Sequence, residues 1–77
     1  MKTLIKEHTR PADGGGIRYL LFEENEGGRR FYSAMIELSD NNDDSAELLC
    51  DIAPNRAEAL ALFERFFCEN RLPARSR

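Results

Sequence analysis

Residues 18–38 read RYLLFEENEGGRRFYSAMIEL, and in this stretch two segments with alternating apolar residues flank a pair of glycines. A glycine pair in this position is typical of a two-residue hairpin turn, because both central residues of such a turn need a positive φ. Counting outward from Gly27 and Gly28 predicts an antiparallel hairpin and its register. The predicted cross-strand pairs are Arg18–Glu37, Leu20–Met35, Phe22–Ser33 and Glu24–Phe31 on one face, and Ile17–Leu38, Tyr19–Ile36 and Leu21–Ala34 on the other.

The two faces of this hairpin differ in polarity. Since side chains alternate along a strand, Tyr32, Ala34 and Ile36 share one strongly apolar face. The other face mixes apolar Phe31 and Met35 with polar residues. A half-buried strand should have one apolar and one wet face, so the mixed face needs a physical explanation.

Turn signals at residues 11–16, 25–28 and 40–44 divide the first part of the chain. The segments between them are short and rich in β-branched, aromatic or alternating residues. They predict four strands, at about residues 2–9, 17–25, 29–39 and 45–52, joined as an antiparallel meander with a flexible loop at 11–16.

The segment NRAEALALFERFFCENRLP predicts a helix over about residues 54–70. Asn55 followed by Glu58 fits an N-terminal capping box, and Ala53 before Pro54 is the alternative cap position. Asn70 suits a left-handed residue after the helix. Leu62 falls on the predicted polar side. The predicted apolar stripe consists of Ala59, Leu60, Phe63, Phe66 and Phe67.

Such an aromatic stripe must be buried, and one face of the sheet is the available surface. The predicted fold class is therefore α+β: a four-stranded antiparallel meander with one C-terminal helix packed on one sheet face. A chain of 77 residues allows one domain, predicted at residues 1–73, with a flexible basic tail at 74–77. The face expected under the helix consists of Ile17, Tyr19, Leu21, Tyr32, Ala34, Ile36, Leu38, Leu48, Cys50 and Ile52.

A single helix covers only one sheet face, which explains the mixed strand as the uncovered side. An apolar surface on that side is typical of an interface. The candidate interface residues are Leu20, Phe22, Phe31, Met35 and Leu49. Either a second copy or a different protein covers them. In the alternative, the chain is a monomer whose patch lies under the side chains of Arg18, Glu24, Glu37 and Glu47.

Composition excludes several classes of function. A net charge of −3 argues against a dedicated nucleic-acid binder, because neutralising phosphates requires a basic surface. No apolar run approaches the ~18 residues of a membrane span. The start MKTLIKEHTR lacks the apolar core of a signal peptide, so the expected location is the cytoplasm and no membrane partner is expected.

Chemistry-bearing residues are sparse. His8 is the only histidine, and Cys50 and Cys68 show no paired spacing. We expect an exposed strand histidine and two packed, reduced thiols, with no cofactor and no enzymatic activity. The alternative function is a small-molecule or metal-binding protein in which His8, Cys50 and Cys68 converge, as a zinc site would require.

The segment LLCDIAPNRAEALALFERFFCENRLP resembles a family of short, uncharacterised bacterial proteins, a domain of unknown function. The matching positions are Asp51, Ile52, Pro54, Arg56, Phe63, Asn70 and Pro73. The hairpin segment also looks like the family's central hairpin, so the resemblance covers about residues 17–73. Ala53 stands where the family has a serine cap. The resemblance implies no activity. The predicted function is a small non-enzymatic protein-interaction module, whose partner is either a second copy or an unidentified protein.

Overall fold

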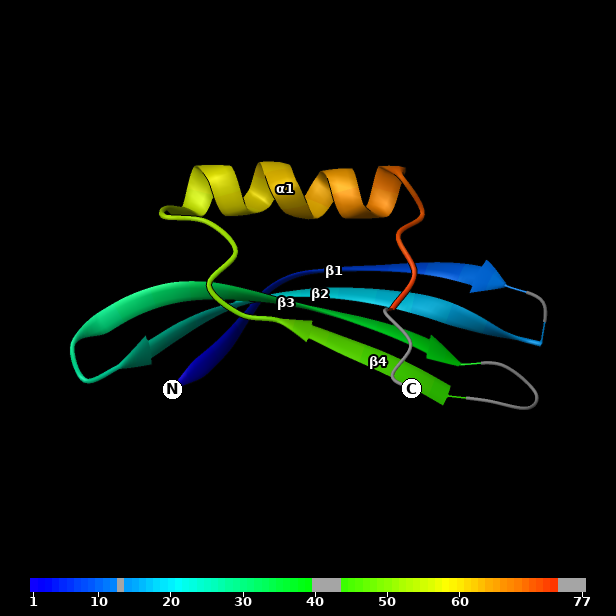
Figure 1. Cartoon of the computed structure of the whole chain (residues 1–77), viewed down its shortest axis with the longest axis horizontal. Helices are drawn as coiled ribbons and strands as arrows, with labels where there is room; N and C mark the ends of the chain where they lie inside the picture. Colours follow the sequence, from blue (N-terminus) through cyan, green and yellow to red (C-terminus); the bar gives the residue numbers. More distant parts are fainter. Residues whose placement is uncertain (13, 40–43, 74–77) are drawn as a thin grey trace.

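The computed structural model describes residues 1–12, 14–39 and 44–73. The chain forms one four-stranded antiparallel sheet in the order β1-β2-β3-β4, with a helix across one face (Figure 1). This confirms the predicted fold class. The predicted tail at 74–77 and most of the predicted turn at 40–44 lie outside the described residues. The elements are β1 (Lys2–Ala12), β2 (Gly15–Glu26), β3 (Arg29–Ser39), β4 (Asp44–Leu49) and α1 (Arg56–Cys68).

The central hairpin has the predicted register. β2 and β3 pair from Gly16–Ser39 to Glu26–Arg29, and every pair predicted from the glycine turn is present. Gly27 and Gly28 have φ values of 59° and 80°, which are left-handed conformations that glycine adopts without a steric penalty. The turn chemistry therefore sets the register of the two longest neighbouring strands.

The first hairpin is longer than predicted. Residues 11–16 were expected to form a flexible loop, but Pro11 pairs with Gly16 and Ala12 with Gly15. The strands therefore continue almost to their connection. β1 also contains a register shift between Leu4 and Lys6, where one extra residue interrupts the ladder.

The strand β4 has the opposite phase from the one predicted. Leu49 pairs with Ala34 and packs against the core, whereas Leu48 pairs with Met35 and is 47% exposed. The placement of Leu49 on the open face and of Leu48 under the helix was therefore wrong. Two consecutive leucines fit either phase of a strand, so periodicity alone could not decide between them. Cys50 follows β4 and is exposed rather than buried under the helix.

The helix α1 begins as the capping pattern predicts. The Asn55 Oδ1 accepts the Glu58 backbone N–H at 2.9 Å, and the Asn55 Nδ2 donates to the Glu58 carboxylate at 2.8 Å. Asn70 takes a left-handed φ of 54° just after the helix, and the Arg71 N–H returns to the Phe66 carbonyl. Both ends of α1 thus satisfy backbone groups that a helix leaves unpaired.

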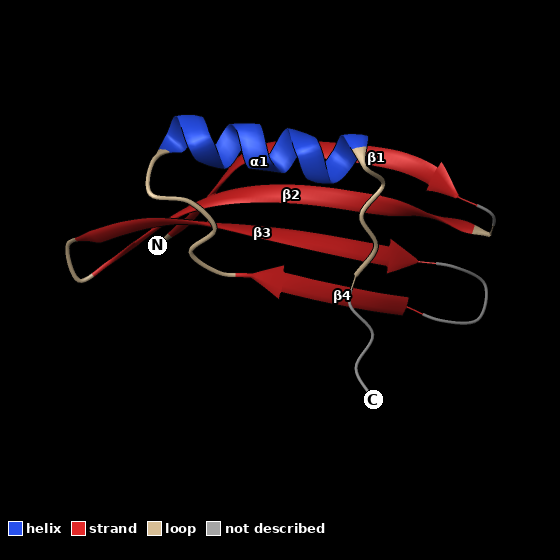
Figure 2. Cartoon of the chain, turned by 45° about the horizontal axis from the view of Figure 1, so that its top comes forward, coloured by secondary structure: helices blue, strands red, loops and turns tan. Residues whose placement is uncertain are grey.

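The core lies between α1 and the facing side of the sheet. Figure 2 shows α1 running along the strands on one side of the sheet, with β4 at the edge away from β1. Leu62, predicted on the polar side of α1, packs against this core, so that assignment was wrong. The buried cluster consists of Ile17, Tyr19, Leu21, Tyr32, Ala34, Ile36, Ala59, Phe63 and Phe66.

Candidate interaction surface

The sheet face away from α1 carries apolar side chains from all four strands, and Glu7 of β1 and Ser33 of β3 lie among them. The register places Leu4 of β1 beside Phe22 of β2. It also places Met35 of β3 between Leu20 of β2 and Leu48 of β4. Phe31 lies two residues before Ser33, on the same side of β3. We call this set the open-face patch; its members are Leu4, Leu20, Phe22, Phe31, Met35 and Leu48.

The open-face patch is separate from the core. None of its residues belongs to the buried cluster under α1 or packs against that cluster. Leu4 and Leu48 are each 47% exposed at the two outer strands. Leu20, in the middle of the sheet, is only 8% exposed, because its neighbours on the same face surround it. The patch is therefore a packed apolar layer without a second layer above it.

Cations lie over the aromatic rings at one end of this patch. The Lys2 ammonium is 4.8 Å from the ring centroid of Phe22, and the Arg29 guanidinium is 5.1 Å from that of Phe31. Arg29 also forms an ion pair with Asp51. These long side chains shield the two rings from water while keeping their charges solvated.

One buried polar group lies within the patch. The Ser33 side chain is fully buried, and its hydroxyl donates to the Glu24 carboxylate at 2.5 Å. Because the hydroxyl is paired, its burial costs little. A polar pair of this kind gives the patch a fixed hydrogen-bonding feature beside its apolar residues.

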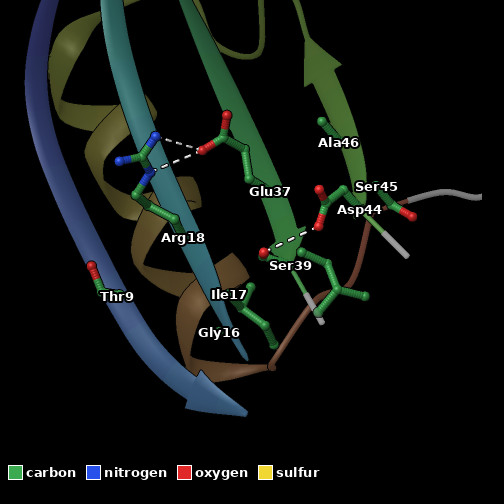
Figure 3. A pocket seen from close by; sticks show the side chains of 10 residues that line it. Thr9, Gly16, Ile17, Arg18, Glu37, Ser39, Asp44, Ser45 and Ala46 are labelled. Carbon is green, nitrogen blue, oxygen red and sulfur yellow. Dashed lines mark hydrogen bonds and ion pairs between the residues drawn. The ribbon is translucent and has the colours of Figure 1, made fainter. Parts of the chain in front are cut away.

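The other end of the open face is polar and hollow. Arg18 forms an ion pair with Glu37 at 2.8 Å (Figure 3). The Arg18 guanidinium also lies 3.7 Å from the Glu7 carboxylate. Ser39 donates to the Asp44 carboxylate at 3.1 Å. Small side chains leave a shallow hollow of about 510 Å³ around these groups. The residues that line it are Thr9, Gly16, Ile17, Arg18, Glu37, Leu38, Ser39, Asp44, Ser45 and Ala46.

The structure brings together most of the predicted interface. Leu20, Phe22, Phe31 and Met35 lie on the open face, as expected. Leu49 lies on the opposite face, and Leu4 and Leu48 were missed. Strict alternation along β1 would place Leu4 on the same face as Lys6 and His8. The register shift between Leu4 and Lys6 instead moves it to the open face, so its alignment with Phe22 could not be predicted from the alternation.

Of the charged residues proposed to cover the patch in a monomer, Arg18, Glu24 and Glu37 do lie on the open face. Glu47 does not, since it pairs with Ile36 and its carboxylate lies 3.4 Å from Arg71 on the helix side.

His8 occupies a different environment from the exposed strand position that was predicted. Its ring stacks on Phe67 and Phe63, with centroids 4.4 and 5.5 Å apart, so the prediction was wrong. Its Nε2 lies 2.9 Å from the Glu64 carboxylate, which also pairs with Lys6 at 2.5 Å. Hydrogen bonds from Lys6 and then His8 lower the pKa of Glu64 below its ordinary value. The contacts of Lys6 and His8 with Glu64, and of His8 with Phe67, therefore connect β1 to α1.

The three residues considered for a metal site do not converge. Cys50 directly follows β4, where the chain rises to the start of α1, and Cys68 closes α1 at its other end (Figure 1). Both thiols are exposed, so their predicted packing was wrong. Within residues 1–12, 14–39 and 44–73, no group of three or more His, Cys, Asp or Glu residues is placed to hold a metal ion.

No protein-family model, no curated protein and no solved structure matches the chain. None of the helices in the described part of the chain combines the length and apolar character needed to cross a membrane.

Proposed function

We propose that this chain is a small non-enzymatic interaction module that binds a protein through its open sheet face. The observation that carries this proposal is the open-face patch, a layer of large apolar side chains that does not belong to the core. Apolar layers of this kind on small domains are typical of interaction sites.

The layout of the face supports the same function. Protein interfaces combine an apolar centre with a polar rim. Here Leu20 and Met35 lie at the centre, the ion pair of Arg18 and Glu37 lies toward one end, and that of Arg29 and Asp51 lies at the other. A strand-based surface of this type is rigid, so little backbone entropy is lost when a partner binds.

We infer further that the protein acts in the bacterial cytoplasm. The resemblance of residues 17–73 to a family of uncharacterised bacterial proteins supports the bacterial origin. The two cysteines, Cys50 and Cys68, are both unpaired, as is typical of a reducing compartment.

Photo-crosslinking in living cells tests the function of the open face. A benzophenone amino acid replaces Leu48, which is 47% exposed on the open face. The matched control carries the same group at Ala57, an exposed position on α1. We expect irradiation to give a protein adduct from position 48 and none from position 57. Equal labelling from the two positions, or none from either, contradicts the proposal.

A further inference from the structure

We propose that the partner of the open face is a second copy of this chain. The two copies pack face to face about a two-fold axis that runs parallel to the strands, between β2 and β3. This inference rests on the proposed function of the open face and names its partner.

The size of the face is close to what a stable dimer needs. The sheet is four strands wide, and its strands β1, β2 and β3 are 11, 12 and 11 residues long. The fourth strand, β4, has only 6 residues, so at ~3.3 Å per residue and ~4.8 Å between strands such a face covers roughly 630 Å². Standard interfaces bury about 800 Å² on each partner, with a lower limit of about 600 Å². A copy that covers the face from end to end thus reaches the lower end of the usual range.

The register makes the two central strands of the face complementary to themselves, while Glu7 at the edge faces the partner's Leu48. Rotation about the proposed axis exchanges β2 and β3, so each residue faces the partner's copy of its own cross-strand neighbour. Leu20 therefore faces the partner's Met35, because Leu20 and Met35 are neighbours within one chain. By the same relation, Arg18 faces the partner's Glu37, and Glu37 faces the partner's Arg18.

The two charges can take part in such contacts. The side chains of Arg18 and Glu37 are 51% and 36% exposed, and they form an ion pair with each other. In the proposed dimer the two in-chain pairs become one four-membered network of alternating charge. Thr9 and Ala46 also face one another across the interface, and their small size leaves room for the longer charged side chains.

The other two-fold arrangement is less favourable. An axis across the strands, through the row of Leu20 and Met35, would place Arg18 over the partner's Phe22. It would place Glu37 over the partner's Ser33, whose hydroxyl is already bound to Glu24. Both charges would lose water without gaining an opposite charge, which is costly. Electrostatics therefore select the axis parallel to the strands.

Charge reversal tests both the partner and the axis. Arg18→Glu and Glu37→Arg each place like charges opposite one another at both symmetric positions. We expect each variant alone to raise the dimer Kd by an order of magnitude or more, because like charges across an interface repel. An equimolar mixture of the two variants restores opposite charges at both positions. Native mass spectrometry of the mixture should show predominantly the mixed dimer, with a Kd near that of the unmodified chain.

The matched control applies the same charge changes away from the interface. Arg65 and Glu69 form an exposed i,i+4 ion pair on α1. Arg65→Glu and Glu69→Arg should leave the Kd unchanged, and their mixture should show a statistical distribution of dimers. If a single reversal on the open face unfolds the chain, the double variant Arg18→Glu/Glu37→Arg restores the in-chain pair. That variant should dimerise like the unmodified chain.

The outcomes separate this inference from the proposed function. An unmodified chain that stays monomeric at tens of micromolar overturns the second copy as partner. If position 48 then crosslinks to a different protein, the interaction function survives; if it crosslinks to nothing, both proposals fail. The proposed axis is overturned if charge reversal leaves the dimer Kd unchanged and the mixture of the two variants shows no excess of the mixed dimer.

Discussion

Phe63 is the residue on which the covered face depends most. Its side chain is fully buried in the cluster under α1, and its ring also stacks on His8 of the outer strand. It therefore joins the central core to the edge of the sheet. Leu62, its neighbour in sequence, is only partly buried at the margin of the same core.

Phe63→Ala should lower the free energy of unfolding by about 3–5 kcal/mol, because it removes a buried ring and leaves a cavity. That loss threatens a domain whose total stability is of the order of 5–15 kcal/mol. Leu62→Ala should cost clearly less, since the side chain is partly solvated. Urea denaturation of both variants measures the two costs. Equal costs would show that Leu62 is as deeply packed as Phe63.

Gly28 carries the conformation on which the central hairpin depends. Its φ is 80°, and a Cβ added there would meet no atom within 4 Å. The cost of Gly28→Ala is therefore backbone strain alone, about 1–2 kcal/mol. Gly28→Asn should cost less, because asparagine tolerates the left-handed region. Denaturant midpoints for the two variants provide the comparison. A smaller loss of stability in Gly28→Ala than in Gly28→Asn would contradict this account.

At the scale of elements, β1 is held to α1 by polar and aromatic contacts rather than by an aliphatic layer. Lys6, His8 and Arg10 alternate along β1 on the covered face and all reach α1. Arg10 donates to the Phe67 carbonyl at 3.1 Å, and its guanidinium lies 4.1 Å from the Phe67 ring centroid. A cation at the last turn of a helix also interacts favourably with the helix dipole.

The link between Glu64 and β1 should depend on pH. Lys6 and His8 lower the pKa of folded Glu64, so ionised Glu64 favours the folded state. Its contribution is complete above the unfolded pKa of about 4.3 and disappears as pH falls through the lower folded pKa. The unfolding free energy of the unmodified chain should therefore exceed that of Glu64→Gln at neutral pH, and this difference should vanish in acid.

Urea titrations from neutral to strongly acidic pH measure this difference. The control is Glu69→Gln, which removes an exposed carboxylate that contacts Arg65 on α1 and should change the unfolding free energy little. A Glu64→Gln difference that stays constant into acid would show that shape, rather than charge, accounts for the contact.

The elements also show which features were accessible from sequence. The β2–β3 hairpin was predictable to the residue, because two glycines fix the turn and the turn fixes the register. The start of α1 was predictable because Asn55 and Glu58 form a local cap. The phase of β4 was not, since Leu48 and Leu49 suit both faces. The position of His8 could not be predicted either, because its partner Glu64 lies 56 residues away in sequence. The polar residues that alternate along β1 are also typical of a solvent-exposed strand face.

At the scale of the whole molecule, the described residues form two layers, a sheet and a helix, and the second face of the sheet has no layer over it. α1 covers one side of the sheet (Figure 2), and the open-face patch lies on the other. Met35 lies in the middle of that patch, between Leu20 and Leu48. Substitutions at this position therefore separate association from folding.

Met35→Glu should convert the proposed dimer into a monomer. Its carboxylate would have to lose water in the interface but stays hydrated in the free chain, and Glu37 nearby adds repulsion. Sedimentation velocity measures the state of association, and far-UV circular dichroism should remain native. Ala57→Glu, on the exposed surface of α1, should leave the dimer intact. An unfolded Met35→Glu chain would show that Met35 contributes to the stability of the monomer itself.

The meander order has a kinetic consequence. Every strand pairs with its neighbour in sequence, so the sheet can form hairpin by hairpin with short loop closures. The docking of α1 joins parts of the chain that lie further apart in sequence, such as His8 and Glu64. A meander needs no crossover connection between its strands, and we expect refolding of the Met35→Glu chain in the millisecond range. The chain has no tryptophan, so the buried Tyr19 and Tyr32 would report this step in stopped-flow fluorescence. Refolding over many seconds would mean that docking of α1, not hairpin formation, limits how quickly the protein becomes native.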